Sequence, residues 1–187
     1  MDPKLDPFTT LLDLKLGTFD PERGPVQVRT QEDLRGFFQA DPPRPDELVY
    51  RVMPVPVPTE NSEIQCSTTV LEPGTVGDEY YMTKGHFHAV RDRSEIYIGL
   101  AGEGCLVLAT EDGRHRVEPI REGMVNYVPG GWAHRSVNVG DEPLVFFAAY
   151  VGDAGHDYAT IERDGFPVLV CRGDDGPVVT DNPHYRP

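Results

Sequence analysis

Apolar and polar residues alternate over short runs through the middle of the chain, which is the pattern of half-buried β-strands. In residues 46–53, for example, Leu48, Tyr50 and Val52 share one face of the predicted strand. Other runs that we assign as strands occupy residues 62–71, 95–100, 105–109, 115–120, 124–128 and 144–151. Residues 60–150 show no helical periodicity, which argues against a parallel sheet connected by helices.

Turn signals separate these runs. Asp112 and Gly113 lie between residues 105–109 and 115–120, and an Asp-Gly pair in that place predicts a hairpin. Pro129 is followed by two glycines, which predicts a tight turn. The chain has 18 prolines and 19 glycines, which suits short strands joined by tight turns. The middle of the chain therefore predicts an all-β sandwich or barrel.

The N-terminal region differs from the middle because it is rich in Asp, Pro and Gly. Residues 1–29 carry an apolar patch that consists of Leu11, Leu12, Leu14 and Leu16. We expect this region to be an arm that packs on the barrel or on a second subunit. Thr30, with Asp33 three residues later, has the pattern of a helix N-cap and predicts a short helix that ends before residue 41.

A chain of 187 residues is long enough for one domain with a sizeable core. We expect residues 1–60 to form an N-terminal arm and edge strands that pack on the barrel or on a partner subunit. Residues 61–151 are expected to form the barrel with the metal site. Residues 152–187 are expected to extend the same domain, with a short helix near residues 160–163 and strands at 167–171 and 177–180.

The composition is ordinary for a globular protein, with 39% apolar and 26% charged residues. The formal net charge of −14 argues against nucleic acids and anionic membranes as partners, because both bind basic surfaces. The longest apolar run, residues 144–151, is too short to span a bilayer.

The cysteines and the N-terminus bear on the compartment. Cys66, Cys105 and Cys171 are widely spaced and odd in number, which suits reduced thiols in the cytoplasm. The chain does not begin with a basic segment followed by an apolar core, so we expect no signal peptide. We therefore expect a cytoplasmic protein.

Candidate metal ligands gather on three strand-like segments. His86 and His88 alternate with Phe87, so both imidazoles lie on one face. Glu95 begins the next strand and comes close to the two histidines if the two segments pair in a hairpin. His134 follows the predicted tight turn. Imidazole and carboxylate ligands suit Fe(II), Mn(II), Ni(II) or Zn(II) and do not choose among them.

A lone His-x-His pair is a weak signal, because two surface or core histidines explain it equally well. The joint pattern is more specific: Gly-x5-Pro-x-Gly-x2-His-x3-Asn follows Glu-x6-Gly. It is matched by Glu95, Gly102, Gly123, Pro129, Gly131, His134 and Asn138. These motifs resemble the two-motif signature of the cupin superfamily. They depart from it between His88 and Glu95, where six residues stand in place of the three or four of most cupins.

That departure and several longer motifs point to one branch of the superfamily. The motifs are TKGHFH from residue 83, EIY from 95, GLAGEG from 99, YVPGGWAHR from 127 and DAGHDY from 153. Together they resemble the cupin-type glucose-6-phosphate isomerase family of archaea and some bacteria, over residues 45–183. The resemblance implies an all-β fold, the cupin double-stranded β-helix or jelly-roll barrel, with an N-terminal arm and small helical elements.

The resemblance also implies roles for individual residues. The expected metal ligands are His86, His88, Glu95 and His134, with Fe(II) as the first choice of divalent metal ion and Mn(II), Ni(II) or Zn(II) as alternatives. The expected catalytic residues are Glu95, Tyr97 and His156. The expected substrate-binding residues, which surround the phosphate or the sugar, are Thr69, Thr83, Gly85, Tyr150 and Tyr158. Without the resemblance, Tyr97 and Tyr150 fit equally well as core residues, and His156 fits as a loop histidine.

The implied function is that of a metal-dependent glucose-6-phosphate isomerase, which interconverts glucose 6-phosphate and fructose 6-phosphate in glycolysis and gluconeogenesis. The alternatives are an isomerase that also or instead takes mannose 6-phosphate, a cupin dioxygenase and a storage cupin. The complete ligand set argues against storage. Either a base carries a proton through a cis-enediol or a hydride shifts between neighbouring carbons, and the sequence leaves both routes open.

A phosphosugar substrate conflicts with the net charge of −14, so a local group of cations has to attract it. The candidates next to the ligands are Lys84, Arg91, Arg93 and Arg135, each of which fits a solvated surface as well. Barrels of this family are commonly dimers, and we expect a homodimer in which the arm and the Pro-rich residues 54–58 form the interface.

Overall fold

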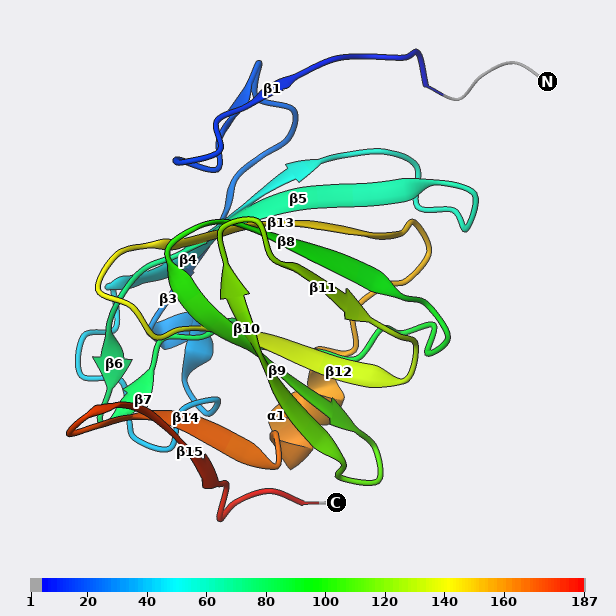
Figure 1. Cartoon of the computed structure of the whole chain (residues 1–187). Helices are drawn as coiled ribbons and strands as arrows, with labels where there is room; N and C mark the ends of the chain where they lie inside the picture. Colours follow the sequence, from blue (N-terminus) through cyan, green and yellow to red (C-terminus); the bar gives the residue numbers. More distant parts are fainter. Residues whose placement is uncertain (1–4, 187) are drawn as a thin grey trace.

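The computed structural model describes residues 5–186, and nearly all of its regular elements are antiparallel β-strands (Figure 1). The first four residues of the expected arm and the last residue of the expected C-terminal extension lie outside the described residues.

The largest sheet has six strands. In spatial order they are β11 (Val125–Val128), β8 (Glu95–Ala101), β13 (Leu144–Val151), β5 (Ile64–Leu71), β4 (Leu48–Val55) and β3 (Gln27–Thr30). Side chains on β8 alternate as its sequence predicts: Glu95 and Tyr97 are buried, whereas Ile96 is 40% exposed. This alternation points Glu95 and Tyr97 into the barrel.

A three-stranded sheet faces the large one and closes the core. Its strands are β10 (His115–Arg121), β9 (Glu103–Thr110) and β12 (Trp132–Asn138). The two sheets meet at Tyr97 of β8 and His134 of β12, whose ring centroids lie 5.8 Å apart. Leu106 of β9 and Phe146 of β13 belong to the same buried cluster. The candidate ligand His134 therefore projects into the space between the sheets.

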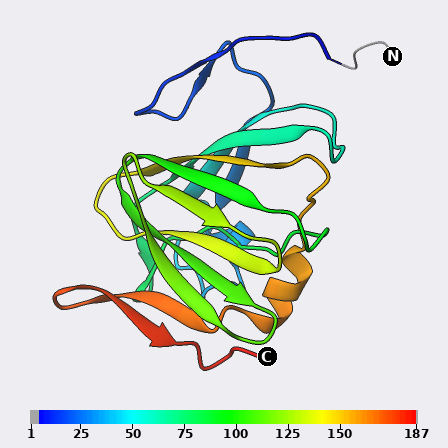
Figure 2. The ribbon, with the colours of Figure 1, turned by 45° about the vertical axis from the view of Figure 1, so that its right-hand side comes forward.

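Smaller elements cover the ends of this barrel. They are a four-stranded sheet of β15 (Gly176–Asp181), β14 (Val168–Gly173), β7 (Glu79–Tyr80) and β6 (Thr75–Val76), the hairpin β1 (Leu11–Leu12) and β2 (Phe19–Asp20), the helix α1 (Tyr158–Asp164), and one 3₁₀ turn, η1 (Glu32–Leu34). In both views the N-terminal hairpin lies at one end of the molecule and β14 with β15 at the other (Figures 1 and 2). This architecture confirms the all-β fold, with an arm and small helical elements, that the sequence predicts.

Two local expectations differ from the structure. Only η1 forms where the sequence predicts a helix after Thr30. The backbone N–H of Thr30 does donate to the Asp33 carboxylate, at 2.8 Å, but Gly36 takes a left-handed φ of +85° and ends the helical path. The second difference is that β8 does not pair in a hairpin with the His86–His88 segment, since its neighbours are β11 and β13.

None of the helices in residues 5–186 combines the length and the apolar character that a transmembrane crossing requires.

Candidate metal centre

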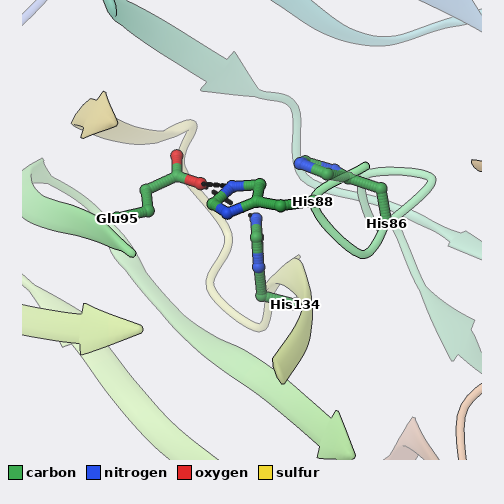
Figure 3. A group of neighbouring side chains, drawn as sticks. All are labelled: His86, His88, Glu95 and His134. Atoms are coloured by element: carbon green, nitrogen blue, oxygen red, sulfur yellow. Dashed lines mark hydrogen bonds and ion pairs between the residues drawn. The ribbon is translucent and has the colours of Figure 1, made fainter. Parts of the chain in front are cut away.

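Three histidines and one glutamate converge inside the barrel: His86, His88, Glu95 and His134 (Figure 3). One nitrogen or oxygen atom of each residue lies within 4.8 Å of the corresponding atom of every other. His86 and His88 come from the segment between β7 and β8, Glu95 opens β8, and His134 lies on β12. The structure thus brings together all four residues that the sequence analysis names as ligands.

Backbone pairing sets the positions of His86 and His134. The N–H of His86 donates to the carbonyl of His134 at 3.2 Å, and the N–H of His134 donates back at 3.0 Å. Gly85 makes the turn that leads into this pair, with a φ of +72°. A Cβ atom at Gly85 would lie 2.7 Å from the Phe166 ring and 2.9 Å from Arg135, so glycine is required there.

A neutral His88 presents an acceptor nitrogen to Glu95. Its Nδ1 lies 2.8 Å from the carbonyl of Arg93, which can only accept, so Nδ1 carries a proton. The other nitrogen, Nε2, lies 3.1 Å from Glu95 Oε2. Two acceptors at that distance require a positive charge between them, from a proton or from a metal ion. Burial opposes protonation of His88, but Glu95 outweighs it, and the pKa of His88 is raised.

His86 and His134 supply unpartnered nitrogens. The Nε2 atoms of both are buried and have no hydrogen-bond partner. His134 Nε2 does lie 3.0 Å from Glu95 Oε2, but the two groups are not oriented as in a hydrogen bond, so the pair is a close contact. Burial, followed by the nearby His134, lowers the pKa of His86 well below its usual range, so this imidazole is neutral.

The charge states of His86 and Glu95 suit a divalent cation. Burial alone would raise the pKa of Glu95, but His134 and then His88 more than offset it and hold that pKa well below its usual range. Neutral imidazoles and an ionised carboxylate are the forms that bind metals. Three nitrogens and one oxygen are a donor set for Fe(II), Mn(II), Ni(II) or Zn(II). The residues therefore fit a divalent metal ion.

A cavity of about 300 Å³ opens beside these ligands. Its lining contains every residue that the sequence analysis names as a catalytic or substrate-binding residue: Thr69, Thr83, Gly85, Glu95, Tyr97, Tyr150, His156 and Tyr158. The ring centroids of His156 and Tyr158 lie 4.4 Å and 5.3 Å from that of His86. Burial lowers the pKa of His156, so it faces the ligands as a neutral imidazole.

The expected group of four cations does not form. Arg91 is bound by Asp157 at 2.6 Å and by Glu111 at 3.0 Å. Arg93 is bound by two more carboxylates, those of Asp153 and Asp92. Neither arginine lines the cavity, because acidic neighbours on the outer surface hold both side chains. Of the four candidates only Lys84 lines the cavity.

The remaining candidate, Arg135, is 4% exposed and lies behind the cavity wall. Its guanidinium group donates twice to the carbonyl of Lys84, at 3.2 Å and 2.8 Å, and lies 4.6 Å from the centre of the Phe166 ring. Arg135 therefore supports the backbone of residues 84 and 85.

Arg29 lines the cavity and is absent from the sequence-based candidates. It lies on β3, beside Tyr50 of β4, which lines the cavity as well. Within residues 5–186, neither Arg29 nor Lys84 forms an ion pair. Alternation in residues 27–30 puts Gln27 and Arg29 on one face, a signal that is hidden when residues 1–29 are read as an arm.

A family model described as "Glucose-6-phosphate isomerase (GPI)" matches residues 29–185. A protein of Pyrococcus horikoshii named "Glucose-6-phosphate isomerase" is 42% identical over an alignment of 187 positions, which spans 97% of this chain and 98% of the relative. A protein of Thermococcus kodakarensis with the same name is 43% identical, over 85% of this chain and 87% of its own length. A "Putative glucose-6-phosphate isomerase 2" of Rhizobium meliloti is 40% identical, over 74% and 72%.

Among solved structures, oxalate decarboxylase from Bacillus subtilis is similar over 58% of this chain and 26% of its own, with 24% sequence identity and a TM-score of 0.45.

Proposed function

Because the chain belongs to the glucose-6-phosphate isomerase family, we propose that it interconverts glucose 6-phosphate and fructose 6-phosphate as a metal-dependent enzyme. The observation that carries the proposal is one cavity in which a three-histidine, one-glutamate centre faces a wall of hydroxyl groups and two cations that form no ion pair with residues 5–186. A metal ion at the centre can polarise the carbonyl group of the substrate, and the hydroxyl groups and cations can bind its phosphate.

The four ligands His86, His88, Glu95 and His134 would hold a divalent metal ion, for which we propose Fe(II), with Mn(II), Ni(II) and Zn(II) as alternatives. When bound, such an ion polarises the sugar carbonyl and stabilises the negative charge that develops as hydrogen moves between neighbouring carbons. Side chains of the protein carry out proton transfer and bind the substrate.

Glu95 is the proposed proton carrier, and Tyr97 is buried two residues later on the same face of β8. Burial, and next the charge of Glu95, raises the pKa of Tyr97 well above its usual range, so the phenol keeps its proton. Ligation lowers the basicity of a carboxylate, so the ligand and base roles of Glu95 compete. His156, neutral and 4.4 Å from His86 between ring centroids, is proposed to hydrogen-bond the substrate oxygens.

The phosphate is proposed to bind beside Thr69, Thr83 and Gly85, which line the cavity. Lys84 and Arg29 line the same cavity without carboxylate partners among residues 5–186, so their charges remain available to a dianion. Tyr150 and Tyr158 are proposed to contact the sugar. This arrangement explains how a chain with a net charge of −14 attracts a phosphosugar.

The cavity lining favours an isomerase over a dioxygenase. Wholly apolar lining side chains are few: Val52, Pro54, Phe146 and Ala148. Lining side chains with a hydroxyl group are more numerous: Tyr50, Ser67, Thr69, Thr83, Tyr97, Ser136, Tyr150 and Tyr158. A polar, phosphorylated substrate suits that lining better than an apolar one. Mannose 6-phosphate shares the chemistry of the proposed substrate and remains the alternative substrate.

We also propose that the protein is a cytoplasmic homodimer that acts in glycolysis and gluconeogenesis. Leu11, Leu14 and Leu16 of the N-terminal hairpin are 70%, 61% and 61% exposed, and such a group of exposed leucines is typical of a protein–protein interface.

The test is turnover of fructose 6-phosphate by the metal-loaded protein, followed with a glucose-6-phosphate dehydrogenase as coupling enzyme. Parallel samples receive mannose 6-phosphate or unphosphorylated fructose. Because fructose would give unphosphorylated glucose, the fructose sample is coupled to a glucose dehydrogenase instead, and an oxygen electrode records uptake in all samples. We expect turnover of fructose 6-phosphate, much slower turnover of fructose, and no oxygen uptake. Oxygen uptake without isomerisation would instead support the dioxygenase alternative.

A further inference from the structure

His156, which lies between β13 and α1, and Tyr158, which is the first residue of α1, both face the metal centre. Backbone hydrogen bonds join residues 155–158 to the segment of His86 and His88: the N–H of Asp157 donates to the carbonyl of Phe87 at 2.8 Å, and the N–H of Phe87 donates back at 3.4 Å. The N–H of Ala89 also donates to the carbonyl of Gly155. Residues 155–158 therefore run antiparallel to residues 86–89.

This pairing decides which side chains face the centre. Phe87 and Asp157 form the hydrogen-bonded pair, so their side chains share one face and their neighbours in sequence share the other. The ring distances agree, because both His156 and Tyr158 lie against His86. Whatever fixes Asp157 therefore fixes the two residues that flank it.

Arg91 connects the two segments on the outer face. Its guanidinium group donates to the carbonyl of His88 at 2.5 Å and to Oδ2 of Asp157 at 2.6 Å. It also lies 4.6 Å from the centre of the Phe87 ring and donates to Glu111 at 3.0 Å. One side chain thus contacts the backbone of a candidate metal ligand and the carboxylate between His156 and Tyr158.

Asp157 is held from its other side as well. Its carboxylate accepts from the backbone N–H and the hydroxyl group of Thr160, at 3.2 Å and 2.8 Å, and so caps α1. Arg91 holds the pKa of Asp157 below its usual range, which keeps the carboxylate ionised at neutral pH.

From these contacts we propose that Arg91 and Asp157 are positioning residues, which set His156 and Tyr158 at working distance from the metal centre. The proposal rests on the proposed function, since it assigns the pair a role in the same site. The side chains of Arg91 and Asp157 are 38% and 23% exposed, and ion pairs of that kind contribute little to stability. Their loss should therefore reduce catalysis far more than folding.

The chain provides a matched control. Arg93 and Asp153 form a second ion pair just outside these two segments. It consists of two hydrogen bonds, at 2.7 Å and 2.8 Å, and the side chains are 22% and 28% exposed. Asp153 lies three residues before His156 and does not flank it. The changes to compare are Arg91→Ala, Asp157→Asn and, as the control, Asp153→Asn. Asparagine at residue 157 still caps a helix, so this change isolates the ion pair.

The first measurement needs neither metal nor substrate. Hydrogen–deuterium exchange of the chelated protein should be faster over residues 154–160 in Arg91→Ala and Asp157→Asn than in the unchanged protein, and unchanged in Asp153→Asn.

The second measurement is steady-state turnover of fructose 6-phosphate, with the metal content of each sample determined. We expect kcat to fall about tenfold or more in the first two variants, because misplaced groups lose catalytic geometry. Metal content should stay at the level of the unchanged protein.

A double variant with Arg91→Ala and Asp157→Asn should be no slower than Arg91→Ala alone, since the loss of Arg91 already removes its interaction with Asp157. Unchanged exchange and unchanged kcat would overturn the proposal, as would an equal loss in Asp153→Asn or a loss explained by missing metal. If either variant fails to fold, Arg91→Lys serves in its place, because lysine cannot reproduce the forked contacts of arginine. Absence of isomerase activity in the unchanged protein would refute the proposed function, and the exchange data would still decide the positioning.

Discussion

Glu95 shares one carboxylate oxygen between two imidazoles, with Oε2 3.1 Å from His88 Nε2 and 3.0 Å from His134 Nε2. All three residues are at most 5% exposed. A buried carboxylate that faces nitrogen lone pairs needs a cation, and a divalent ion satisfies all of these groups at once.

Replacement of Glu95 by glutamine should therefore remove most of the bound metal and reduce turnover at least a hundredfold, on the order of 3 kcal/mol of transition-state stabilisation. Elemental analysis and the coupled assay measure the two effects. Glu103→Gln is the control, because Glu103 lies on the surface and pairs with Arg121. Retention of both metal and turnover in Glu95→Gln would refute the assignment of Glu95.

Arg29 is the cavity cation that leads to a prediction about substrate binding. Replacement by leucine should raise KM for fructose 6-phosphate about tenfold and leave kcat nearly unchanged, because a charge-assisted hydrogen bond contributes on the order of 1.5 kcal/mol. Arg51→Leu is the control, since Arg51 lies on the neighbouring strand β4 but pairs with Glu72 and does not line the cavity. An equal KM for the two variants would show that Arg29 does not contact the substrate.

At the scale of elements, Asn138 closes the turn that joins β12 to β13. Its side chain donates to the carbonyls of Leu71 and Glu142, at 2.8 Å and 2.9 Å, and accepts from the N–H of Gly140 at 2.9 Å. The residue is completely buried. This asparagine of the cupin motif therefore ties the turn to β5 and stays away from the cavity.

Asn138→Ala should lower the free energy of unfolding by about 3 kcal/mol, because it leaves buried polar groups without partners. Chemical denaturation provides the measurement. Asn126→Ala is the control and should cost about 1 kcal/mol, because Asn126 makes one hydrogen bond, to the carbonyl of Pro119. Equal destabilisation of both variants would contradict the structural role of Asn138.

Elements with a clear local pattern are predictable from sequence, whereas elements that depend on distant contacts are not. Residues 144–151 coincide with β13, because a short continuous apolar run bounded by turn residues is typical of a buried strand. The helix expected after Thr30 shortens to η1 because Gly36 takes a left-handed φ, and the residue before η1, the buried Gln31, bonds to the hydroxyl group of Tyr81 from another part of the fold. Motif spacing in the sequence also identifies the four candidate ligands. The backbone pairing of His86 with His134, however, depends on the turn at Gly85.

At the scale of the whole molecule, the net charge of −14 is arranged so that carboxylates bind the outer arginines, whereas no carboxylate of residues 5–186 pairs with the cavity cations Arg29 and Lys84. The expectation that Arg91 and Arg93 attract the substrate was wrong for that reason. Sequence gives the number of charges, but their pairing depends on how the surface loops meet.

The homodimer proposal makes a prediction at the same scale. Light scattering should give twice the chain mass of 20.8 kDa, and the double change Leu14→Asp and Leu16→Asp should produce monomers, because charged residues disfavour an apolar interface. Lys15→Asp, at the same exposed turn, should leave the dimer intact. A mass near that of one chain throughout micromolar dilution of the unchanged protein would refute the homodimer.

The central claim is that one divalent metal ion, held by His86, His88, Glu95 and His134, enables the isomerisation of fructose 6-phosphate. The most direct measurement is to chelate the protein, add Fe(II), Mn(II), Ni(II) or Zn(II) in separate titrations, and follow turnover at each addition. We predict that chelation abolishes turnover and that at least one metal restores it, with a break at one equivalent per chain. Full turnover by the chelated protein, or no recovery with any of the metals, would contradict the account.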